Sequence, residues 1–228
     1  MVRLNPSTTH RLLQTLVQLG YIHRDGSKRY HPAARALFPA NLFHPLNILR
    51  RVVSEELLTL RKHFGLAASF VLFMGEERWV METINGSDFL SPYSTTVVSH
   101  SLHATVSGKI LLATLSATER TALIGEGPYE AHTQRTIVMR AALDRELALV
   151  AERGYSTAID ELLLGLSAVG APIWCAPNRP LGAIVLAGPT KHFTESSLID
   201  FAKEASNTAD LFSFASPPVR AACHFIGQ

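Results

Sequence analysis

Two short segments of the sequence approach motifs that carry out catalysis, and each fails at a required position. Ser107-Gly108-Lys109 resembles the end of a phosphate-binding loop, but that motif needs glycine at position 103 and serine or threonine at position 110. His103 and Ile110 occupy those positions. The segment 165–169, Gly-Leu-Ser-Ala-Val, lacks the final glycine of a hydrolase nucleophile elbow. We therefore expect neither a phosphate cradle nor an activated serine.

The residue types present would allow metal binding or acid–base catalysis, but their spacing in the sequence supports neither. His100 and His103 stand three residues apart, yet nothing around them matches a closed zinc site, and an HExxH segment is absent. One hypothesis is that these histidines hold a metal together with Asp160 or Glu161. The favoured hypothesis is that the histidines have a structural role or lie near an effector. The same two carboxylates could form a general acid–base pair, although solvated carboxylates or carboxylates that hold a loop fit better. The sequence thus predicts no enzyme, no metal and no cofactor.

The two cysteines, Cys175 and Cys223, do not form a CxxC pair. This cysteine content rules out a disulfide scaffold and favours a reducing cytoplasm. The N-terminus lacks the apolar core of a signal peptide, and no apolar run reaches the roughly 18–20 residues that span a bilayer. We expect a cytoplasmic protein without membrane contact.

Basic side chains gather in the first 40 residues. This segment holds six Lys or Arg and one acid, a net charge of +5, whereas the remaining residues hold 15 basic and 18 acidic side chains, a net charge of −3. A short basic segment on a mildly acidic body indicates a surface that faces a polyanion. A solvated basic terminus remains the alternative.

The basic segment has the pattern of a helix followed by a hairpin. Residues 5–19 open with Asn-Pro, a typical N-cap and first helical residue, repeat leucine at helical spacing and end at Gly20. Two β-prone pieces around Asp25-Gly26 then predict a hairpin. In a winged helix-turn-helix, such a hydroxyl-rich helix start reaches base edges, and such a basic hairpin, the wing, contacts phosphates. The alternative is a plain helix–hairpin unit whose polar face contacts water.

The rest of the chain is long enough for a domain of ordinary size, since 47% of the 228 residues are hydrophobic and 18% are charged. Its apolar patterns predict helices at 45–63, 104–115, 118–124, 138–153 and 196–212, and strands at 68–73, 79–84, 166–174 and 181–187. Strand pairs mixed with helices, without strict alternation, favour an α+β domain with a largely antiparallel sheet.

Four short motifs occur along the chain in an order that is typical of one protein family. The first is the predicted helix with its continuation, from Pro6 to Ile22. The others are Leu102-His103-Ala104 with Gly108-Lys109, then Gly154-Tyr155 with Asp160-Glu161 and Gly165, then Ala171-Pro172 with Gly182 and Gly188-Pro189. Together they resemble the isocitrate-lyase-regulator (IclR) family of bacterial transcription factors over nearly the whole chain.

The resemblance implies a winged helix-turn-helix over residues 1–40, a linker helix over 41–64 and a GAF-like domain that binds a small organic effector over 65–228. Family members are usually homodimers, or dimers of dimers, on palindromic sites in double-stranded DNA. The side chains implied to contact DNA are Ser7, Thr8, Thr9, His10, Arg11 and Gln14 of the helix and Lys28 and Arg29 of the wing.

The N-terminal segment departs from the family pattern. In the family the recognition helix is the third helix and rests on two earlier ones, whereas here it begins at residue 6. Without that support Leu12, Leu13 and Leu16 are expected to be exposed and the helix to be marginal on its own. Either the chain begins at a downstream methionine, or this product binds DNA poorly or not at all.

The effector pocket departs from the pattern in its polarity. Similar regulators hold an effector carboxylate with backbone amides at the start of the Gly-Lys helix, here Val106 and Ser107, where unpaired N–H groups and the helix dipole favour an anion. The other pocket positions of the family fall on Ala158, Ala168, Val185 and Ala187. Because this set is apolar, an aromatic or alkyl carboxylate is favoured over a very polar keto-acid, and a pocket that has lost its ligand is the alternative.

Three functional hypotheses remain. The leading one is an effector-responsive transcription regulator that binds DNA through residues 1–40. The second is an effector-binding or dimerisation protein without competent DNA binding. The third is a small-molecule enzyme that uses the GAF-like pocket.

Overall fold

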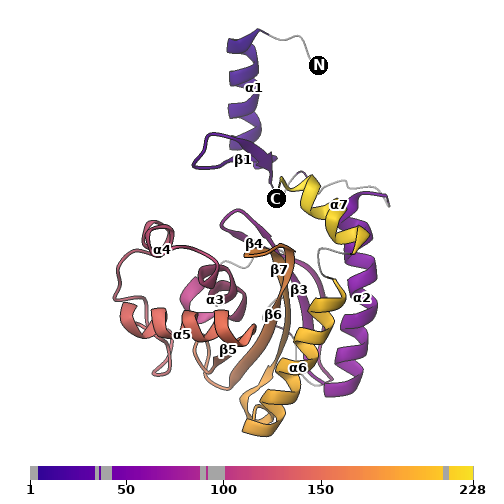
Figure 1. Cartoon of the computed structure of the whole chain (residues 1–228), viewed down its shortest axis with the longest axis vertical. Coiled ribbons are helices and arrows are strands. Elements are labelled where there is room, and N and C mark those ends of the chain that lie inside the picture. The colour runs from indigo at the N-terminus through magenta and orange to yellow at the C-terminus, as the bar shows by residue number, and fades with distance from the viewer. Residues whose placement is uncertain are drawn as a thin grey trace.

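The computed structural model describes residues 5–33, 36, 43–87, 91, 101–212 and 216–227. Its N-terminal part is a helix and a two-stranded hairpin that project from a larger C-terminal domain (Figure 1). These elements are α1 (Pro6–Gln18), β1 (Ile22–Arg24) and β2 (Tyr30–Pro32).

The predicted helix start and hairpin turn are both present. The Asn5 side chain accepts a hydrogen bond from the Ser7 amide at 3.0 Å, and Pro6 is the first helical residue. The hairpin is antiparallel, and the Asp25 carboxylate accepts the Arg29 amide across the turn at 2.8 Å. Caps and turn residues were therefore sufficient to predict this region.

A 20-residue helix, α2 (Pro45–Phe64), confirms the helix predicted over 45–63. It ends at Gly65, whose φ of 70° is the left-handed conformation that glycine adopts most easily. Apolar side chains at helical spacing, from Leu46 to Leu60, are buried on one face of α2. The helix is thus packed against the C-terminal domain along its length.

Five antiparallel strands form the centre of the C-terminal domain. They are β3 (Ala67–Met74), β4 (Glu77–Ile84), β5 (Ser156–Ile159), β6 (Leu166–Ala176) and β7 (Arg179–Pro189). Their order in the sheet is β4-β3-β7-β6-β5. The hairpins β3–β4 and β6–β7 are local in sequence, whereas β3 and β7 pair across a long connection, with Ala67 opposite Ala187. The α+β class with an antiparallel sheet is confirmed.

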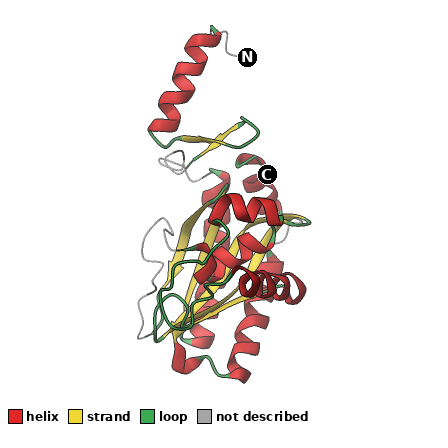
Figure 2. Cartoon of the chain, turned by 90° about the vertical axis from the view of Figure 1, so that its left-hand side faces the viewer, coloured by secondary structure: helices red, strands yellow, loops and turns green. Residues whose placement is uncertain are grey.

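Helices cover both faces of this sheet (Figure 2). They are α3 (Val106–Ala113), α4 (Ala117–Ile124), α5 (Arg140–Arg153), α6 (Glu195–Leu211) and α7 (Pro217–Phe225), with 3-10 turns η2 (Leu102–Ala104) and η3 (Thr190–His192). The helices α2, α6 and α7 lie on one side of the sheet, and α3 and α5 lie on the other (Figure 1). The helix predicted over 104–115 is divided, because Thr105 is extended between η2 and α3. No helix in the described part of the chain combines the length and apolar character needed to cross a bilayer.

The two faces of the sheet contribute to separate buried clusters. Large side chains such as Phe70 and Leu72 form the main core with α2, α6 and α7. Small side chains such as Ala168 and Ala187 face α3 and α5. The first turn of α3 lies close to the sheet, since a Cβ added at Gly170 would lie 2.9 Å from Val106 Cγ1. The small side chains are local to β5, β6 and β7, since Phe73 and Val71 of β3 are buried on the same face.

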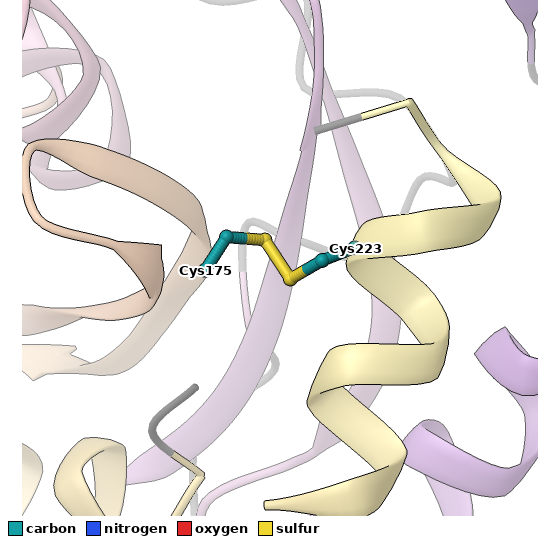
Figure 3. The surroundings of a disulfide bond; sticks show 2 residues. All are labelled: Cys175 and Cys223. Atoms are coloured by element: carbon teal, nitrogen blue, oxygen red, sulfur yellow. A yellow bond between two sulfur atoms is a disulfide. The ribbon is translucent and has the colours of Figure 1, made fainter. Parts of the chain in front are cut away.

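Two elements and one covalent bond were not predicted. The strand β5 and the helix α7 lie in segments to which no element was assigned. Cys175 at the end of β6 and Cys223 in α7 form a disulfide, with their Cα atoms 5.9 Å apart (Figure 3). This bond corrects the expectation drawn from the cysteine content, because a separation of 48 residues carries no signal that two cysteines are close in space.

Candidate functional site

The helix α1 exposes most of the side chains expected to contact DNA. Ser7, His10, Arg11 and Gln14 are exposed, while Thr8 and Thr9 are half-buried. The first turn of α1 contains no acidic residue, so the positive end of the helix dipole is not neutralised there. The arrangement suits a phosphate at the helix start and polar contacts along the exposed face.

The opposite, apolar side of α1 is also open to solvent. No residue of α1 is buried, and Leu12 and Leu16 are 47% and 37% exposed. This confirms the exposure expected for a recognition helix without supporting helices. Leu13 is half-buried rather than exposed.

The wing presents the expected basic side chains, and its turn is held by Asp25. Lys28 and Arg29 are exposed, and Arg29 Nε lies 3.3 Å from the Asp25 carboxylate. The hydrogen bond from His31 Nε2 to that carboxylate, at 2.9 Å, holds the pKa of Asp25 well below its usual range. Arg24 adds a third cation, which lies over the Tyr30 ring at 5.4 Å. Arg24 was not among the predicted contacts, although it belongs to the same basic run.

The residues expected to bind an effector come together on the α3 side of the sheet. Ala158 pairs with Ala168, and Ala168 pairs with Ala187 on its other side, so three small side chains form a row across β5, β6 and β7. Val185 and Val106 belong to the same buried cluster. The sixth residue, Ser107, is fully buried in the first turn of α3. The family resemblance thus selected residues that are neighbours in space.

A buried cation that was not predicted lies at the N-terminal end of α3. Arg78 of β4 is 3% exposed, and its Nη1 donates to Thr105 Oγ1 at 2.6 Å and to Ser107 Oγ at 3.3 Å. The guanidinium therefore lies beside the first amides of the helix, where the dipole also favours an anion. The interpretation of the pocket as apolar needs correction, since it considered only the family positions. Arg78 and Val80 stand two residues apart on β4, so their side chains lie on the same face of the sheet. This spacing is the one signal in the sequence that could have placed Arg78 on this face.

The paired carboxylates have structural partners. Glu161 Oε1 accepts from Lys109 Nζ at 2.7 Å, and Lys109 is fully buried in α3. Burial raises the pKa of the Glu161 carboxyl. Asp160 accepts the Gly165 amide at 2.7 Å and the Thr190 hydroxyl at 2.6 Å. Asp160 therefore holds the β5–β6 loop, as favoured from the sequence, whereas Glu161 is buried and not solvated.

The histidine of the metal hypothesis also has a structural partner. His103 is buried, its Nε2 lies 2.9 Å from the Glu130 carbonyl oxygen, and burial lowers its pKa. Its ring stacks on those of Tyr129 and His132. His100 lies outside the described residues. Within the described residues no group of three or more His, Cys, Asp or Glu is placed to hold a metal ion.

Hollows in the described part of the C-terminal domain include two near the far end of α3. One lies between α3, the end of α5 and β6, with Ile110, Val150 and Trp174 among its lining residues. The other lies under the turns β3–β4 and β6–β7, with Gly75 and Asn178 among its lining residues. Neither is lined by the six predicted effector residues.

Comparisons with known proteins agree with this architecture. The family model described as "Bacterial transcriptional regulator IclR C-terminal" matches residues 43–214, and the model described as "IclR helix-turn-helix domain" matches residues 3–26. The second match covers α1, β1 and the first residues of the hairpin turn.

Individual relatives extend over most of the chain. The regulator XynR of Escherichia coli is 28% identical over 205 residues, which is 90% of this chain and 81% of that protein. The transcriptional repressor IclR of the same organism is 27% identical over 198 residues, covering 86% and 72%. An IclR homologue of Microbacterium hydrocarbonoxydans, solved in complex with 4-hydroxybenzoate, shares the fold with a TM-score of 0.67 at 20% identity, covering 93% of this chain and 88% of that one.

These relatives are named as transcriptional regulators and not as enzymes. The C-terminal family model alone spans well over half of the residues, and the N-terminal model covers the helix and the turn of the hairpin. The chain belongs to the IclR family of bacterial transcriptional regulators, with a segment of the family's helix-turn-helix domain followed by the family's C-terminal domain.

Proposed function

We propose that α1 and the wing of this chain contact operator DNA directly. The polar face of α1 reaches base edges and adjacent phosphates, and the wing holds the DNA backbone. The side chains proposed for α1 are Ser7, Thr8, Thr9, His10, Arg11 and Gln14, and those for the wing are Lys28 and Arg29. The observation in support is the open, basic surface of α1 and the wing.

The α3 side of the sheet is the proposed effector site. A ring or alkyl chain would lie on the row of small side chains formed by Ala158, Ala168 and Ala187, with Val185 beside them. A carboxylate would be bound at the start of α3 by the amides of Val106 and Ser107 and by the neighbouring Arg78. The 4-hydroxybenzoate complex of the Microbacterium homologue supports an aromatic acid as a ligand class for this fold.

The single observation that carries the effector proposal is the position of Arg78. The guanidinium is 3% exposed and lies beside the first turn of α3, so a carboxylate at this point would lie next to a positive charge and to the N-terminal end of a helix. Two of its acceptors, Thr105 and Ser107, are neutral hydroxyls. An effector carboxylate would add charge complementarity at this point.

The proposed molecule works as a homodimer or a dimer of dimers in the cytoplasm. Residues 1–40 form the DNA-binding region, 41–64 the linker and 65–228 the effector-binding domain. Effector binding would change the relative placement of two DNA-binding regions, which couples two distinct sites.

The second candidate function is an effector-binding and dimerisation protein that lacks competent DNA binding. It is favoured by one observation, the absence of any buried residue in α1. A helix without tertiary packing is marginal in water, so its DNA-binding surface would be poorly organised.

Fluorescence anisotropy with labelled DNA from upstream of the protein's own gene separates the two candidates. For a regulator we expect a saturable complex that weakens by about tenfold or more when salt rises from about 50 to about 200 mM, and that unlabelled non-specific DNA displaces poorly. Benzoate, hexanoate and pyruvate are then titrated into that complex. A response to benzoate or hexanoate but not pyruvate supports the effector class, whereas a folded dimer that does not bind the DNA supports the second candidate.

A further inference from the structure

The wing is in contact with two separate parts of the C-terminal domain. A Cβ added at Gly75, in the β3–β4 turn, would lie 3.1 Å from His23 Nε2, so the His23 ring lies against that turn. A Cβ added at Gly227, just after α7, would lie 2.5 Å from His31 Nδ1, so the His31 ring lies against the end of the chain. The two rings stack on each other with centroids 5.3 Å apart. The wing is therefore clamped between the β3–β4 turn and the end of α7, near the label C in Figure 1.

The contact of His31 extends to the basic turn of the wing. His31 Nε2 donates to the Asp25 carboxylate at 2.9 Å, and the other oxygen of this carboxylate accepts the Arg29 amide at 2.8 Å. Any displacement of His31 is thus transmitted to the turn that carries Lys28 and Arg29.

The last turn of α7 also holds the start of α2. The His44 ring, which caps α2, packs edge-on against Phe225 with centroids 4.3 Å apart. The residues that follow Cys223 thus contact both the wing, against which α1 packs, and the residue that caps α2.

The Cys175–Cys223 disulfide fixes this last turn of α7 to the sheet. Cys223 lies in the main core with Val219, Ala222 and Ile226, and Cys175 is half-buried at the end of β6 (Figure 3). The bond joins α7 directly to the central β6–β7 hairpin. Gly227 and Phe225 stand four and two residues beyond the anchored cysteine.

A disulfide at this position is unusual for a protein that works on DNA. Proteins that act on a bacterial chromosome work in a reducing compartment, where the disulfides that do form are mostly transient and redox-sensing. We propose that Cys175–Cys223 is a redox switch that controls how the wing is clamped, and hence the affinity for operator DNA. The effect on DNA affinity rests on the proposed function, whereas the effect on the wing does not.

The chemistry of the switch is thiol–disulfide exchange with a small dithiol. A thiolate of the dithiol attacks the sulfur of Cys175, the S–S bond breaks, and Cys223 leaves as a thiolate that takes up a proton. The second thiol of the reductant resolves the mixed disulfide, leaving two protein thiols and an oxidised dithiol. In the reverse direction hydrogen peroxide oxidises one thiol to a sulfenic acid with loss of water, and the second thiol displaces another water to restore the bond.

Hydrogen exchange of the full chain, with and without dithiothreitol, tests the clamp directly. We expect reduction to increase amide exchange at least threefold in α7 and in the wing, while α5 stays unchanged as an internal reference. The double variant C175S/C223S should behave like the reduced protein in both conditions. Unchanged exchange in the wing, with or without faster exchange in α7, would overturn the proposal.

A second variant perturbs the clamp while the disulfide remains intact. In Gly227→Ala the new Cβ would displace the His31 ring, so exchange in the wing should rise without added reductant. Gly154→Ala is the matched control, since Gly154 has nearly the same positive φ, 78° against 77°, but nothing within 4 Å of the added atom. Equal effects of the two variants on the wing would contradict the clamp.

Operator affinity of the oxidised and reduced protein completes the test. A change of at least threefold in either direction, absent from C175S/C223S, is the expected result. Equal affinities alongside a changed wing would overturn the regulatory part of the proposal. If neither form binds DNA, the proposed function fails, and the exchange experiment still decides whether the clamp exists.

Discussion

Two buried cations of the C-terminal domain lie against α3. Lys109 is fully buried but lies 2.7 Å from the Glu161 carboxylate and 3.6 Å from that of Glu146, so its charge is matched within the protein. Arg78 donates to the hydroxyls of Thr105 and Ser107, which places its guanidinium beside the first turn of α3. The first arrangement stabilises α3 against the β5–β6 loop, and the second is suited to an anion.

Arg11 provides a prediction about DNA contact. It is exposed on the polar face of α1, so Arg11→Ala should leave folding unchanged. If Arg11 reads a base, operator affinity should fall by about 1–3 kcal/mol in anisotropy titrations. Arg145→Ala, which removes an exposed arginine from α5, is the matched control and should have no effect. Equal affinities of both variants and the wild type would remove Arg11 from the interface.

His103 provides a prediction about pH. Burial lowers its pKa in the folded protein below the value of about 6.5 for an exposed histidine. The unfolded state therefore binds more protons than the folded state as the pH falls through about 6.5, and stability is lost on acidification. His44 contributes with the same sign, because burial also lowers its pKa.

The measurement compares melting temperatures at about pH 7.5 and about pH 5.5. His103→Gln, which can still donate to the Glu130 carbonyl oxygen, should reduce the decrease in melting temperature at the lower pH. His192→Gln, at an exposed histidine, should leave that decrease as it is. An undiminished decrease in His103→Gln would show that other groups cause the pH dependence.

At the level of elements, the packing of α3 against η2 requires a residue without a side chain at Gly108. A Cβ added at Gly108 would collide with the backbone of Leu102 in η2. Glycine to alanine in a helix usually stabilises by about 0.5–1 kcal/mol, but here the sign should reverse because η2 and α3 would have to separate. We expect Gly108→Ala to lower the free energy of unfolding by more than about 1 kcal/mol in urea titrations.

The control for this prediction is Gly26→Ala in the wing. Nothing lies within 4 Å of an added Cβ at Gly26, so that variant should be close to neutral. A Gly108→Ala variant as stable as the wild type would mean that η2 and α3 can move apart at little cost.

Elements with strong local signals could be predicted from the sequence. Asn5-Pro6 and Asp25-Gly26 marked the start of α1 and the turn of the wing, and the capping box at Thr194 confirms the predicted start of α6. The strand β5 was not predicted because its four residues are too few to give a clear alternating pattern. The helix α7 was not predicted, although it begins with two prolines and proline is favoured in the first turn of a helix.

The candidate sites could be predicted in part. The effector positions came from the resemblance to the family, and the structure places five of them in one buried cluster, with Ser107 next to Val106 in the first turn of α3. Arg78 could not be found in that way, because it lies on β4, outside the family positions that were considered. The disulfide and the clamp on the wing depend on contacts between residues far apart in the sequence, which no local pattern reveals.

At the level of the whole molecule, the disulfide should contribute to stability as well as to control. Closing a connection of 48 residues restricts the unfolded chain, which corresponds to about 2–4 kcal/mol for such a loop. We expect C175S/C223S to unfold at lower urea concentration than the oxidised wild type by this free energy, and at the same concentration as the reduced wild type. A variant as stable as the oxidised protein would show that packing alone holds α7 in place.

The contact between the wing and Gly227 also has a consequence for biosynthesis. A ribosome makes α1 and the wing first and α7 last, and domains begin to fold as they emerge. Until α7 has been made, the nascent chain therefore carries the proposed DNA-contacting helix and a wing that can reach the β3–β4 turn but not Gly227. A product that terminates before α7 would keep the proposed DNA-contacting surface and lose the contact between His31 and Gly227.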